Sequence, residues 1–304
     1  MLRCIKQLDL QLMNELEFAL ALADKADEIT MFKYQSVDLV VAEKPDLTPV
    51  TEADKAVEQT IRSEIAKQFP NDSILGEEFG LDSATPPPGL TQNDGLLTRQ
   101  WIIDPIDGTK NFVRGVPVWA TLIALAEGNE VIVGVVSAPA MGRRWWAVKG
   151  QGAWVLTKPD VTPLSSFDIQ NKITKPIPKR ISVSQVSDLA HASLAYASLG
   201  GWEEIGKLSK FLQLANRCWR TRGYGDFWSY MLLAEGAVDI AAEPELEIYD
   251  MAALVPIVTE AGGKFTSLNG KPGPWDGNAI ATNTLLHSQA LNYLGPDDLG
   301  PASD

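Results

Sequence analysis

Cysteine and histidine are scarce in this sequence, and their scarcity limits the kinds of site it can build. Its 304 residues contain two cysteines, Cys4 and Cys218, and two histidines, His191 and His287. Neither cysteine belongs to a Cys-x-x-Cys pair, so a zinc site or a Cys/His catalytic pair is poorly supplied. Any metal is therefore expected to bind to oxygen ligands.

Long apolar runs and an excess of positive charge are also missing. No stretch approaches the ~18 uninterrupted apolar residues of a membrane-spanning helix, and Asp9 comes before any long apolar run. We therefore expect neither a spanning helix nor a signal peptide. The expected location is the cytoplasm. The formal net charge of −13 disfavours general binding to nucleic acid or to anionic membranes. Acid-rich sites for cations fit this charge better.

What the sequence does contain is an ordinary globular composition, with 45% hydrophobic and 21% charged residues. A chain of this length can bury a large core, as one domain or as two halves that share a core. The patterns below predict an N-terminal α+β half over residues 1–155, which holds most candidate metal ligands, and a C-terminal α/β half over 156–295. With a flexible tail at 296–304, these halves would form one compact catalytic unit.

Helical periodicity dominates the first part of the chain. Apolar residues at steps of three or four predict a helix over about residues 5–29. A second helix is expected from Thr51, because Thr51-Glu52-Ala53-Asp54 resembles a capping box and apolar residues follow at intervals of four up to Phe69. This helix places Asp54 in its first turn. The segment 85–97 begins in a Pro-rich run and is typical of an exposed loop.

Short β-rich runs separated by turn residues come next. Four of them predict a meander of antiparallel strands, at 101–103, 118–126, 131–137 and 145–148. Beyond a polar, Pro-rich stretch at about 155–178, strand and helix patterns alternate as in an α/β half. The strands predicted there are 181–184, 194–199, 238–242 and 264–266, and the helices are 203–214, one from Asp226, and 250–260 ending at Gly262-Gly263.

One of the predicted strands ends in two acids three residues apart, in Trp101-Ile102-Ile103-Asp104-Pro105-Ile106-Asp107-Gly108-Thr109. Such a turn can aim both carboxylates and a carbonyl at one point. Mg²⁺ prefers hard oxygen ligands, and two such ions can grip the attacking and leaving oxygens of a phosphoryl group. The amides of Gly108 and Thr109, if they open a helix, would present N–H groups to a phosphate oxygen. A capped turn with solvated acids fits this segment equally well.

Further acids stand in contexts that suit such a site. Glu77 and Glu78 follow a strand-like run, Asp54 lies at a helix start, and Asp250 opens a predicted helix. Each of them taken singly is also typical of a helix cap or a surface acid. Asp54 in particular would lie favourably near a positive helix end without any metal. Spacing alone does not show that these acids converge.

Four separated motifs together resemble the inositol monophosphatase family in order and spacing. They are Thr48-Pro49-Val50-Thr51-Glu52-Ala53-Asp54, Gly76-Glu77-Glu78, the segment 101–109, and Tyr249-Asp250-Met251-Ala252-Ala253 followed by Glu260-Ala261-Gly262-Gly263. The match covers roughly residues 10–290. Residues 44–51, 113–119 and 220–227 resemble more narrowly the histidinol-phosphate phosphatases of that family.

The resemblance implies a layered αβαβα sandwich, as in the inositol monophosphatase and fructose bisphosphatase superfamily, and a homodimer. It also implies two or three Mg²⁺ ions per site and inhibition by Li⁺. Carried over by motif, a first metal would be held by Glu77, Asp104 and the Ile106 carbonyl, and a second by Asp104, Asp107 and Asp250.

The same resemblance implies the remaining roles. Glu77 and Thr109 would orient the attacking water, Asp54 would help to hold a looser third metal, and the Gly108 and Thr109 amides would contact phosphate. Metals that lower the pKa of a water, neutralise the phosphate and stabilise the leaving alkoxide make a covalent nucleophile unnecessary. The shortage of His and Cys is consistent with such chemistry.

The family's substrate-recognition region corresponds to Gly225, Asp226, Phe227 and Glu243. Inositol phosphatases carry small uncharged residues after that glycine, whereas this chain has an acid and aromatic residues. Histidinol phosphate bears an ammonium and an imidazole, which acids with aromatic neighbours suit by charge pairing and cation–π contact. A polyol would need neutral donors instead. The alternative is that Asp226 is a helix N-cap and that Phe227 and Trp228 are core residues.

Together with the residues above, the resemblance implies a phosphoric monoester hydrolase that converts L-histidinol phosphate to L-histidinol and phosphate, in histidine biosynthesis, by metal-activated water. Two alternatives stay open. The first is a phosphatase for inositol 1-phosphate or for a broad range of sugar phosphates. The second is a relative that binds protein partners in RNA-related complexes. The charge of −13 argues against direct RNA contact, and the intact set of metal-binding acids argues against a dead enzyme.

Overall fold

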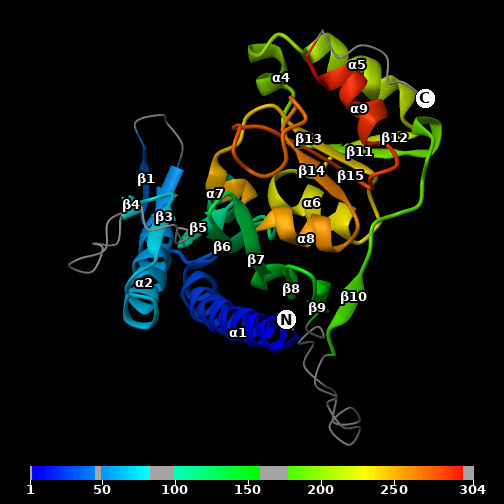
Figure 1. Ribbon diagram of the computed structural model, residues 1–304. Helices are drawn as coiled ribbons and strands as arrows, with labels where there is room; N and C mark the ends of the chain where they lie inside the picture. The colour runs from blue at the N-terminus through cyan, green and yellow to red at the C-terminus, as the bar shows by residue number, and fades with distance from the viewer. Residues whose placement is uncertain (1, 45–48, 83–98, 158–176, 297–304) are drawn as a thin grey trace, which may run out of the picture.

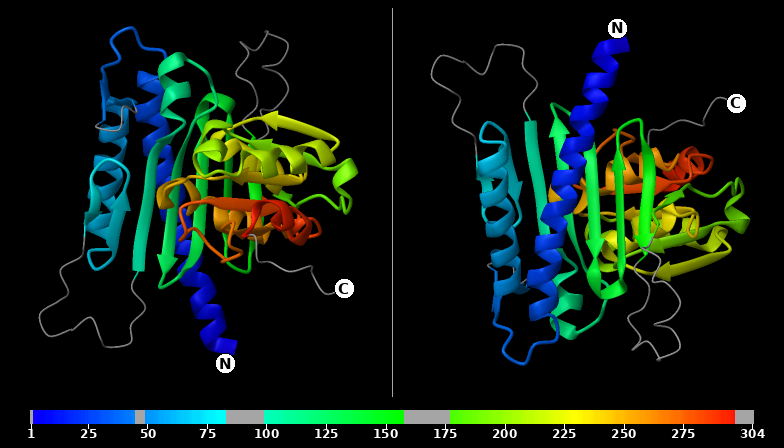
Figure 2. Two further views of the ribbon diagram at one scale, coloured as in Figure 1. Left: turned by 90° about the horizontal axis from the view of Figure 1, so that it is seen from above. Right: turned by 90° about the horizontal axis from the view of Figure 1, so that it is seen from below.

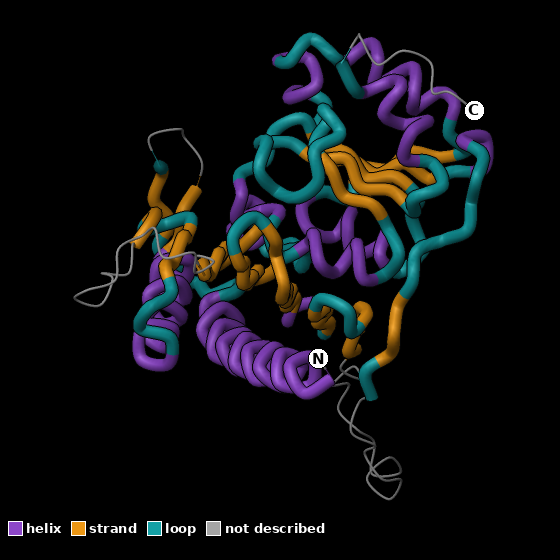
Figure 3. Tube along the Cα trace, viewed as in Figure 1, coloured by secondary structure: helices purple, strands orange, loops and turns teal. Residues whose placement is uncertain are grey.

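The computed structural model describes residues 2–44, 49–82, 99–157 and 177–296, which form five layers (Figure 1). A pair of helices, an eight-stranded sheet, a middle helical layer, a five-stranded sheet and an outer helical layer follow one another (Figure 3). This is the αβαβα sandwich that the resemblance implied. The expected loop at 85–97, most of the Pro-rich stretch and the tail beyond residue 296 lie outside the described residues.

The first helical layer consists of α1 (Leu2–Lys33) and α2 (Glu52–Gln68), which pack together over one face of the large sheet (Figure 2). Their apolar residues form a core with that face. α2 begins directly after Thr51, as predicted, whereas α1 is longer at both ends than the predicted 5–29. Neither α1 nor any other helix in the described part of the chain combines the length and the apolar character needed to cross a membrane.

The large sheet contains the predicted meander. From edge to edge its strands are β10 (Lys179–Ile181), β9 (Gly152–Thr157), β8 (Arg143–Val148), β7 (Glu130–Ala138), β6 (Ala120–Glu127), β5 (Arg99–Asp107), β3 (Ser73–Gly76) and β4 (Gly80–Asp82). Strands β5 to β9 pair in order as antiparallel neighbours, while β3 pairs with β5 in parallel. The strand expected at 181–184 corresponds to β10, which starts earlier and pairs with β9 in this sheet. The division of the chain near residue 155 stays a prediction.

The smaller sheet forms the other half of the sandwich. Its strands in spatial order are β12 (Arg220–Gly223), β11 (Ser193–Tyr196), β13 (Ile240–Glu243), β15 (Ala279–Thr282) and β14 (Lys264–Thr266). Helices α6 (Asp226–Ala234) and α8 (Leu254–Glu260) lie between the two sheets, where the largest core is formed (Figure 1). The outer face is covered by α4 (Gly200–Glu204), α5 (Leu208–Arg217) and α9 (His287–Leu294).

Short elements border the ends of β3 and β5. The hairpin of β1 (Val41–Glu43) and β2 (Pro49–Thr51) leads into α2, α3 (Thr109–Arg114) follows β5, and α7 (Ile248–Met251) contacts β5. Two 3-10 turns, Pro139–Met141 and Leu189–His191, complete the described elements. Because α2, α3 and α7 all begin near this edge, side chains from distant parts of the sequence meet there.

Two predicted helices are each divided in the structure. The helix expected at 203–214 is α4 followed by α5, separated by a turn in which Gly206 has a φ of 69°. The helix expected at 250–260 is α7 followed by α8. Pro256 has no N–H to donate to the Ala252 carbonyl, and its ring crowds that carbonyl, so the helix is interrupted there. The patterns did not predict β9, β15 or α9.

Candidate metal and catalytic site

Two of the predicted acid segments meet because the strands that precede them are parallel neighbours. Gly76 of β3 pairs with Ile103 of β5, and the Glu77 N–H donates to the Ile103 carbonyl oxygen at 3.3 Å. Parallel strands end at the same edge of a sheet, so Glu77 and Asp104 come together there. The irregular register of β5 between Asp104 and Asp107 changes the course of the chain at this edge.

Asp104, Asp107 and Asp250 form the first cluster of acids. One carboxylate oxygen of each lies within 4.8 Å of the other two. The Asp250 side chain accepts the Glu247 N–H at 2.7 Å in a capping box that begins α7. The Asp107 side chain accepts the Phe227 N–H at 2.7 Å, at the start of α6. The structure thus brings together three residues that the resemblance assigned to metals, from distant parts of the chain.

Asp54, Glu77 and Glu78 form a second cluster, again with carboxylate oxygens within 4.8 Å of one another. The Asp54 side chain accepts the Thr51 N–H at 2.8 Å, so the predicted capping box is confirmed and holds Asp54 in the first turn of α2. Lys44 Nζ lies 2.7 Å from Glu77 and 2.6 Å from Glu78. Among the described residues, Lys44 is thus the cationic side chain that pairs with this cluster.

Burial raises the pKa of the acids at this edge. The carboxyls of Asp104 and Asp107 have a pKa well above the usual range, because both are buried and face other acids. Burial also raises the pKa of Asp54 to about 6 and that of Asp250 to about 7. Shifts of this sign arise where burial and neighbouring acids disfavour the charged form more than hydrogen bonds such as those to Asp54 and Asp250 favour it.

Buried oxygens of these acids lack hydrogen-bond donors. Asp104 Oδ1 and Asp54 Oδ1 have no partner, although buried polar atoms normally have one. Among the described residues, no Lys or Arg forms an ion pair with Asp104, Asp107 or Asp250. A donor set made only of carboxylate and carbonyl oxygens fits a hard divalent cation such as Mg²⁺ and does not suit a soft metal.

The turn after Asp107 carries the residues predicted to contact phosphate. Gly108 has a φ of 85°, a left-handed conformation that glycine adopts without strain. The Thr109 hydroxyl donates to the Ile106 carbonyl oxygen at 3.0 Å, so both groups lie at the same edge as the first cluster. Contact of the Gly108 and Thr109 amides with phosphate, and orientation of water by Glu77 and Thr109, stay predictions.

Asp226 and Glu243 border the first cluster from the side of the smaller sheet. Gly225 and Asp226 have positive φ angles of 79° and 49°, so the chain enters α6 through a tight turn. Asp226 Oδ2 accepts a hydrogen bond from Asn111 Nδ2 at 2.9 Å. Glu243 is buried, and its Oε1 has no partner. Burial, followed by repulsion from Asp226, raises the pKa of Glu243 to about 8.

Phe227 contributes its backbone rather than its ring to this region. Its side chain is 1% exposed and packs near Trp145, with ring centroids 6.1 Å apart, while its N–H reaches Asp107. The alternative interpretation, that Phe227 is a core residue, is therefore correct for its side chain. Asp226 is the first residue of α6, and the N-cap is Gly225, so Asp226 is not the N-cap that the same alternative proposed.

Three residues at this edge had no role in the sequence prediction. Lys44 and Asn111 bind acids 33 and 115 positions away, and no spacing in the sequence points to such pairs. Glu58 stands four residues after Asp54 on α2. Helical periodicity places residues four apart on one face, so this spacing was a signal that could have been used.

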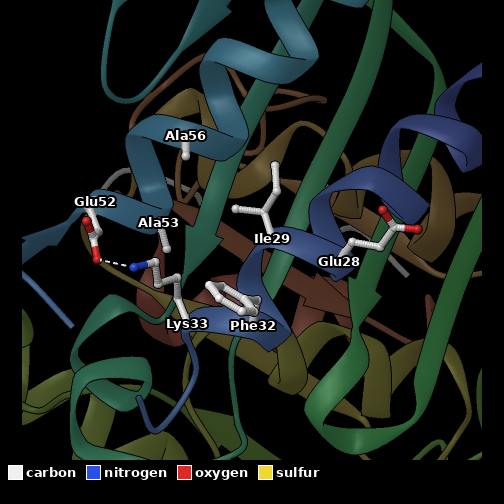
Figure 4. Close-up of a pocket in the computed structure, with 7 residues that line it drawn as sticks. All are labelled: Glu28, Ile29, Phe32, Lys33, Glu52, Ala53 and Ala56. Carbon is white, nitrogen blue, oxygen red and sulfur yellow. Dashed lines mark ion pairs between the residues drawn. The ribbon is translucent and has the colours of Figure 1, made fainter. Parts of the chain in front are cut away.

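A separate hollow of about 380 Å³ opens where the end of α1 meets the start of α2 (Figure 4). Its lining residues are Glu28, Ile29, Phe32, Lys33, Glu52, Ala53 and Ala56. Lys33 and Glu52 form an ion pair of 2.6 Å across one side of it (Figure 4). None of the lining residues belongs to either acid cluster, so we assign the hollow no part in the chemistry.

Known proteins resemble this chain along nearly its whole length. The model of the inositol monophosphatase family matches residues 11–294. Proteins named histidinol-phosphatase from Streptomyces coelicolor and Mycobacterium tuberculosis are both 52% identical, over 93% and 92% of this chain and 97% and 98% of their own lengths. The solved structure of an IMPase from Thermotoga maritima matches with a TM-score of 0.73 at 28% identity, over 92% of this chain and 96% of that one.

Proposed function

The chain belongs to the inositol monophosphatase family, and from this membership we propose that it is a Mg²⁺-dependent phosphatase acting on L-histidinol phosphate. It releases L-histidinol and phosphate, a reaction of histidine biosynthesis. Relatives named histidinol-phosphatase at 52% identity support the substrate. The observation that carries the metal-dependent chemistry is the buried cluster of Asp104, Asp107 and Asp250, in which Asp104 Oδ1 has no hydrogen-bond donor and no described Lys or Arg forms an ion pair.

The metal ligands in this proposal come from the two acid clusters. Asp104, Asp107 and Asp250 would hold Mg²⁺ together with Glu77 and the Ile106 carbonyl. Asp54 and Glu78 would serve a more loosely held ion. When bound, Mg²⁺ supplies the acidity that lowers the pKa of a water molecule and the charge that neutralises phosphoryl oxygens.

The chain's own groups orient the reactants around that centre. The Thr109 hydroxyl and the Glu77 carboxylate direct the attacking water, and the amides of Gly108 and Thr109 donate to phosphoryl oxygens. Thr109 is suited to this role because its hydroxyl already lies 3.0 Å from the Ile106 carbonyl oxygen at the acid edge. Fixed donors of this kind stabilise the charge that develops during hydrolysis without having to reorganise.

Asp226 and Glu243 recognise the organic part of the substrate. Both side chains are acids. Burial of Glu243, followed by its repulsion from Asp226, raises the pKa of Glu243 to about 8. The ammonium and imidazole of histidinol phosphate relieve that repulsion when they pair with these carboxylates. An inositol ring offers only neutral hydroxyl groups, so it gives no such relief. The turn at Gly225 and the bond from the Phe227 N–H to Asp107 hold Asp226 near Asp107, and Glu243 of β13 also lies near enough to raise the pKa of Asp107.

A second candidate substrate class is inositol 1-phosphate or sugar phosphates. It is favoured by a relative named fructose-1,6-bisphosphatase/inositol-1-monophosphatase from Thermotoga maritima, which is 30% identical over 93% of this chain. The higher identity of the histidinol-phosphatases places this candidate second. We also propose that the protein is a homodimer, and light scattering of the purified protein tests this. A role in binding a protein partner beside catalysis is tested by a pull-down.

Phosphate release from a substrate panel tests the proposed function. The purified chain is assayed with L-histidinol phosphate, inositol 1-phosphate and p-nitrophenyl phosphate, each in Mg²⁺ and in excess EDTA. We expect kcat/KM for histidinol phosphate to exceed the others by about tenfold or more, equivalent to ~1.4 kcal/mol. All turnover should cease in EDTA. A preference for inositol 1-phosphate would favour inositol or sugar phosphates as the substrate class. Turnover that continues in EDTA would contradict the proposed metal dependence.

A further inference from the structure

Glu58 is a buried acid on α2 that bonds to the turn carrying Glu77 and Glu78. Its Oε2 accepts the Glu78 N–H at 2.7 Å, and its Oε1 accepts the Phe79 N–H at 3.2 Å. Arg62, one helical turn later, donates from Nε to the same carboxylate at 2.8 Å. Glu58 itself is fully buried. A carboxylate that accepts consecutive backbone N–H groups fixes the orientation of the turn they belong to.

Gly76 allows this close approach. A Cβ at this position would collide with the Glu58 carboxylate, so only glycine leaves room for it. Arg62 extends the same contact to the far side of the turn, where it binds the Gly80 carbonyl and lies 3.0 Å from Asp82. The hairpin of β3 and β4 is therefore held to α2 on both sides of the Glu77-Glu78 segment.

Helix α2 connects this clamp to the metal-binding acids. Asp54, Glu58 and Arg62 follow at intervals of four, which places them on one face of the helix. Asp54 belongs to the cluster with Glu77 and Glu78, while Glu58 bonds to the backbone of the turn that carries those two acids. One rigid helix therefore sets the separation between Asp54 and the turn. The charge of Glu58 is matched by Arg62, so the clamp adds little negative charge to the cluster.

We propose that Glu58 is a positioning residue that holds Glu77 and Glu78 in place for metal binding, an inference that rests on the proposed metal-dependent function. Groups that orient metal ligands without touching the metal typically change its affinity or the activity by about 10- to 100-fold when they are replaced. Glu58→Gln keeps the size of the side chain but offers only one acceptor oxygen for two N–H groups. The turn is then free to move, and the metal itself has to order it.

The effect on metal affinity can be measured without any turnover. Mn²⁺ binding is monitored by the electron paramagnetic resonance signal of the free ion. We expect Glu58→Gln to weaken Mn²⁺ binding about tenfold or more. The Mg²⁺ concentration needed for half-maximal phosphate release should rise in parallel, while kcat at saturating Mg²⁺ and KM for the substrate stay close to wild type. The same change in the Glu77→Gln background should be less than additive, because contacting residues in one network couple.

Glu260→Gln is the matched control. The Glu260 carboxylate accepts the N–H groups of Gly150 and Gly152, both at 2.7 Å, and so holds the β8–β9 turn through the same chemistry. This variant should lower thermal stability as Glu58→Gln does, with no change in Mn²⁺ affinity. If Glu58→Gln folds too poorly to measure, Gly76→Ala, which pushes against the Glu58 carboxylate, should reproduce the loss of affinity.

The outcomes separate this inference from the proposed function. Wild-type Mn²⁺ affinity in folded Glu58→Gln, or an effect that is fully additive with Glu77→Gln, would make Glu58 a purely structural residue and overturn the inference. If the wild type binds no Mn²⁺, both the metal assignment and this inference are lost. If Mn²⁺ binding weakens as expected but histidinol phosphate is not hydrolysed, the inference stands and only the substrate assignment falls.

Discussion

Buried acids gather in two regions of this protein, and the regions differ in what compensates their charge. Where α1 packs on the large sheet, each cluster of acids surrounds an arginine. The pairs are Arg99 with Glu15, Asp72 and Glu127, and Arg144 with Asp24 and Asp27. At the ends of β3 and β5, by contrast, the acids of the first cluster form no ion pair with any Lys or Arg of the described chain.

The acids of the first region stabilise the fold through ion pairs. The acids of the second region repel one another, and the rest of the fold keeps them together. Glu15 and Asp27, both buried, tie α1 to the large sheet through these arginines, and Asp24, whose side chain is 67% exposed, adds a surface contact to Arg144. The acids at the strand ends have a raised pKa because burial and like charges disfavour ionisation there. Natural proteins keep such unfavourable groupings mainly where function needs them. Residue type alone does not separate the arginine-centred acids from Asp104, Asp107 and Asp250, but the presence of a cationic partner among the described residues does.

Removing one charge from the strand-end region is the strongest test of this comparison. Asp104→Asn takes a charge from a buried acid that faces other acids, so the metal-free protein should become more stable. Turnover should fall at least about a thousandfold, which corresponds to ~4 kcal/mol of lost transition-state stabilisation. Thermal melting in EDTA and phosphate release at limiting Mg²⁺ measure the two effects. Near-normal turnover would show that the proposed metal centre is wrong.

Asp27→Asn is the corresponding change in the arginine-centred region. Asp27 accepts hydrogen bonds from Arg144 Nη2 at 2.8 Å and from Ser137 Oγ at 2.7 Å. Breaking a buried ion pair costs up to about 3–5 kcal/mol, so the melting temperature should fall while kcat per folded molecule is unchanged. Asp104→Asn should therefore raise stability and lower activity, whereas Asp27→Asn should lower stability and leave activity unchanged. A loss of activity in folded Asp27→Asn would break the comparison.

The next test removes a neutral group from the strand-end region. Thr109→Ala deletes the hydroxyl that bonds to the Ile106 carbonyl and that we propose directs the attacking water. We expect kcat and kcat/KM to drop together, on the order of a hundredfold, because the interaction is made in the transition state. Thr60→Ala is the control, since the Thr60 hydroxyl also bonds to a backbone carbonyl, that of Ala56, at 2.7 Å on the exposed side of α2. A pure KM effect in Thr109→Ala would assign the hydroxyl to ground-state binding.

Local patterns predicted the parts of the fold that local physics determines. The capping box at Thr51 and the meander from β5 to β8 depend on neighbouring residues, and both are confirmed. The helix expected at 250–260 was wrong in one respect, because the break at Ala252 depends on the missing N–H of Pro256 four residues later. β15 was missed, since it has only four residues, two of them alanine, and it depends on pairing with β13 and β14.

The acids of the site could be named from the sequence, but their convergence could not be derived from spacing. Asp250 joins Asp104 through the packing of α7 on β5, which only the family resemblance indicated in advance. The pairs Lys44 with Glu77 and Asn111 with Asp226 depend on the tertiary fold alone. Glu58 differs from these, because its spacing from Asp54 was visible while its bond to the Glu78 N–H was not.

A smaller effect is expected where the strand-end region meets the organic part of the substrate. Asp226→Asn and Glu243→Gln should each lower kcat/KM for histidinol phosphate by about tenfold or more, since a desolvated charge pair is worth ~2–5 kcal/mol and ~1.4 kcal/mol is one decade. p-Nitrophenyl phosphate has no cation to pair, so its hydrolysis should barely change. Equal losses on both substrates would mean that these acids act through the metal site or the fold.

The dependence of stability on pH compares the two regions in the unmodified chain. In the metal-free protein, burial raises the pKa of Asp54 to about 6, of Asp250 to about 7 and of Glu243 to about 8. The unfolded chain releases these protons near the ordinary carboxyl pKa of about 4. Between that pH and about 8 the folded state therefore binds more protons than the unfolded state, so stability falls as pH rises.

In EDTA we expect the melting temperature to drop by roughly 3 °C or more from pH 5 to pH 8. The reason is that ~1 kcal/mol corresponds to about 2–4 °C for chains of 150–250 residues and somewhat less for a longer one. Saturating Mg²⁺ should flatten this slope by compensating the ionised acids, and Asp104→Asn should flatten it without metal. A melting temperature in EDTA that stays constant or rises over this range would mean that the strand-end acids are compensated by the protein itself, as those around Arg99 and Arg144 are.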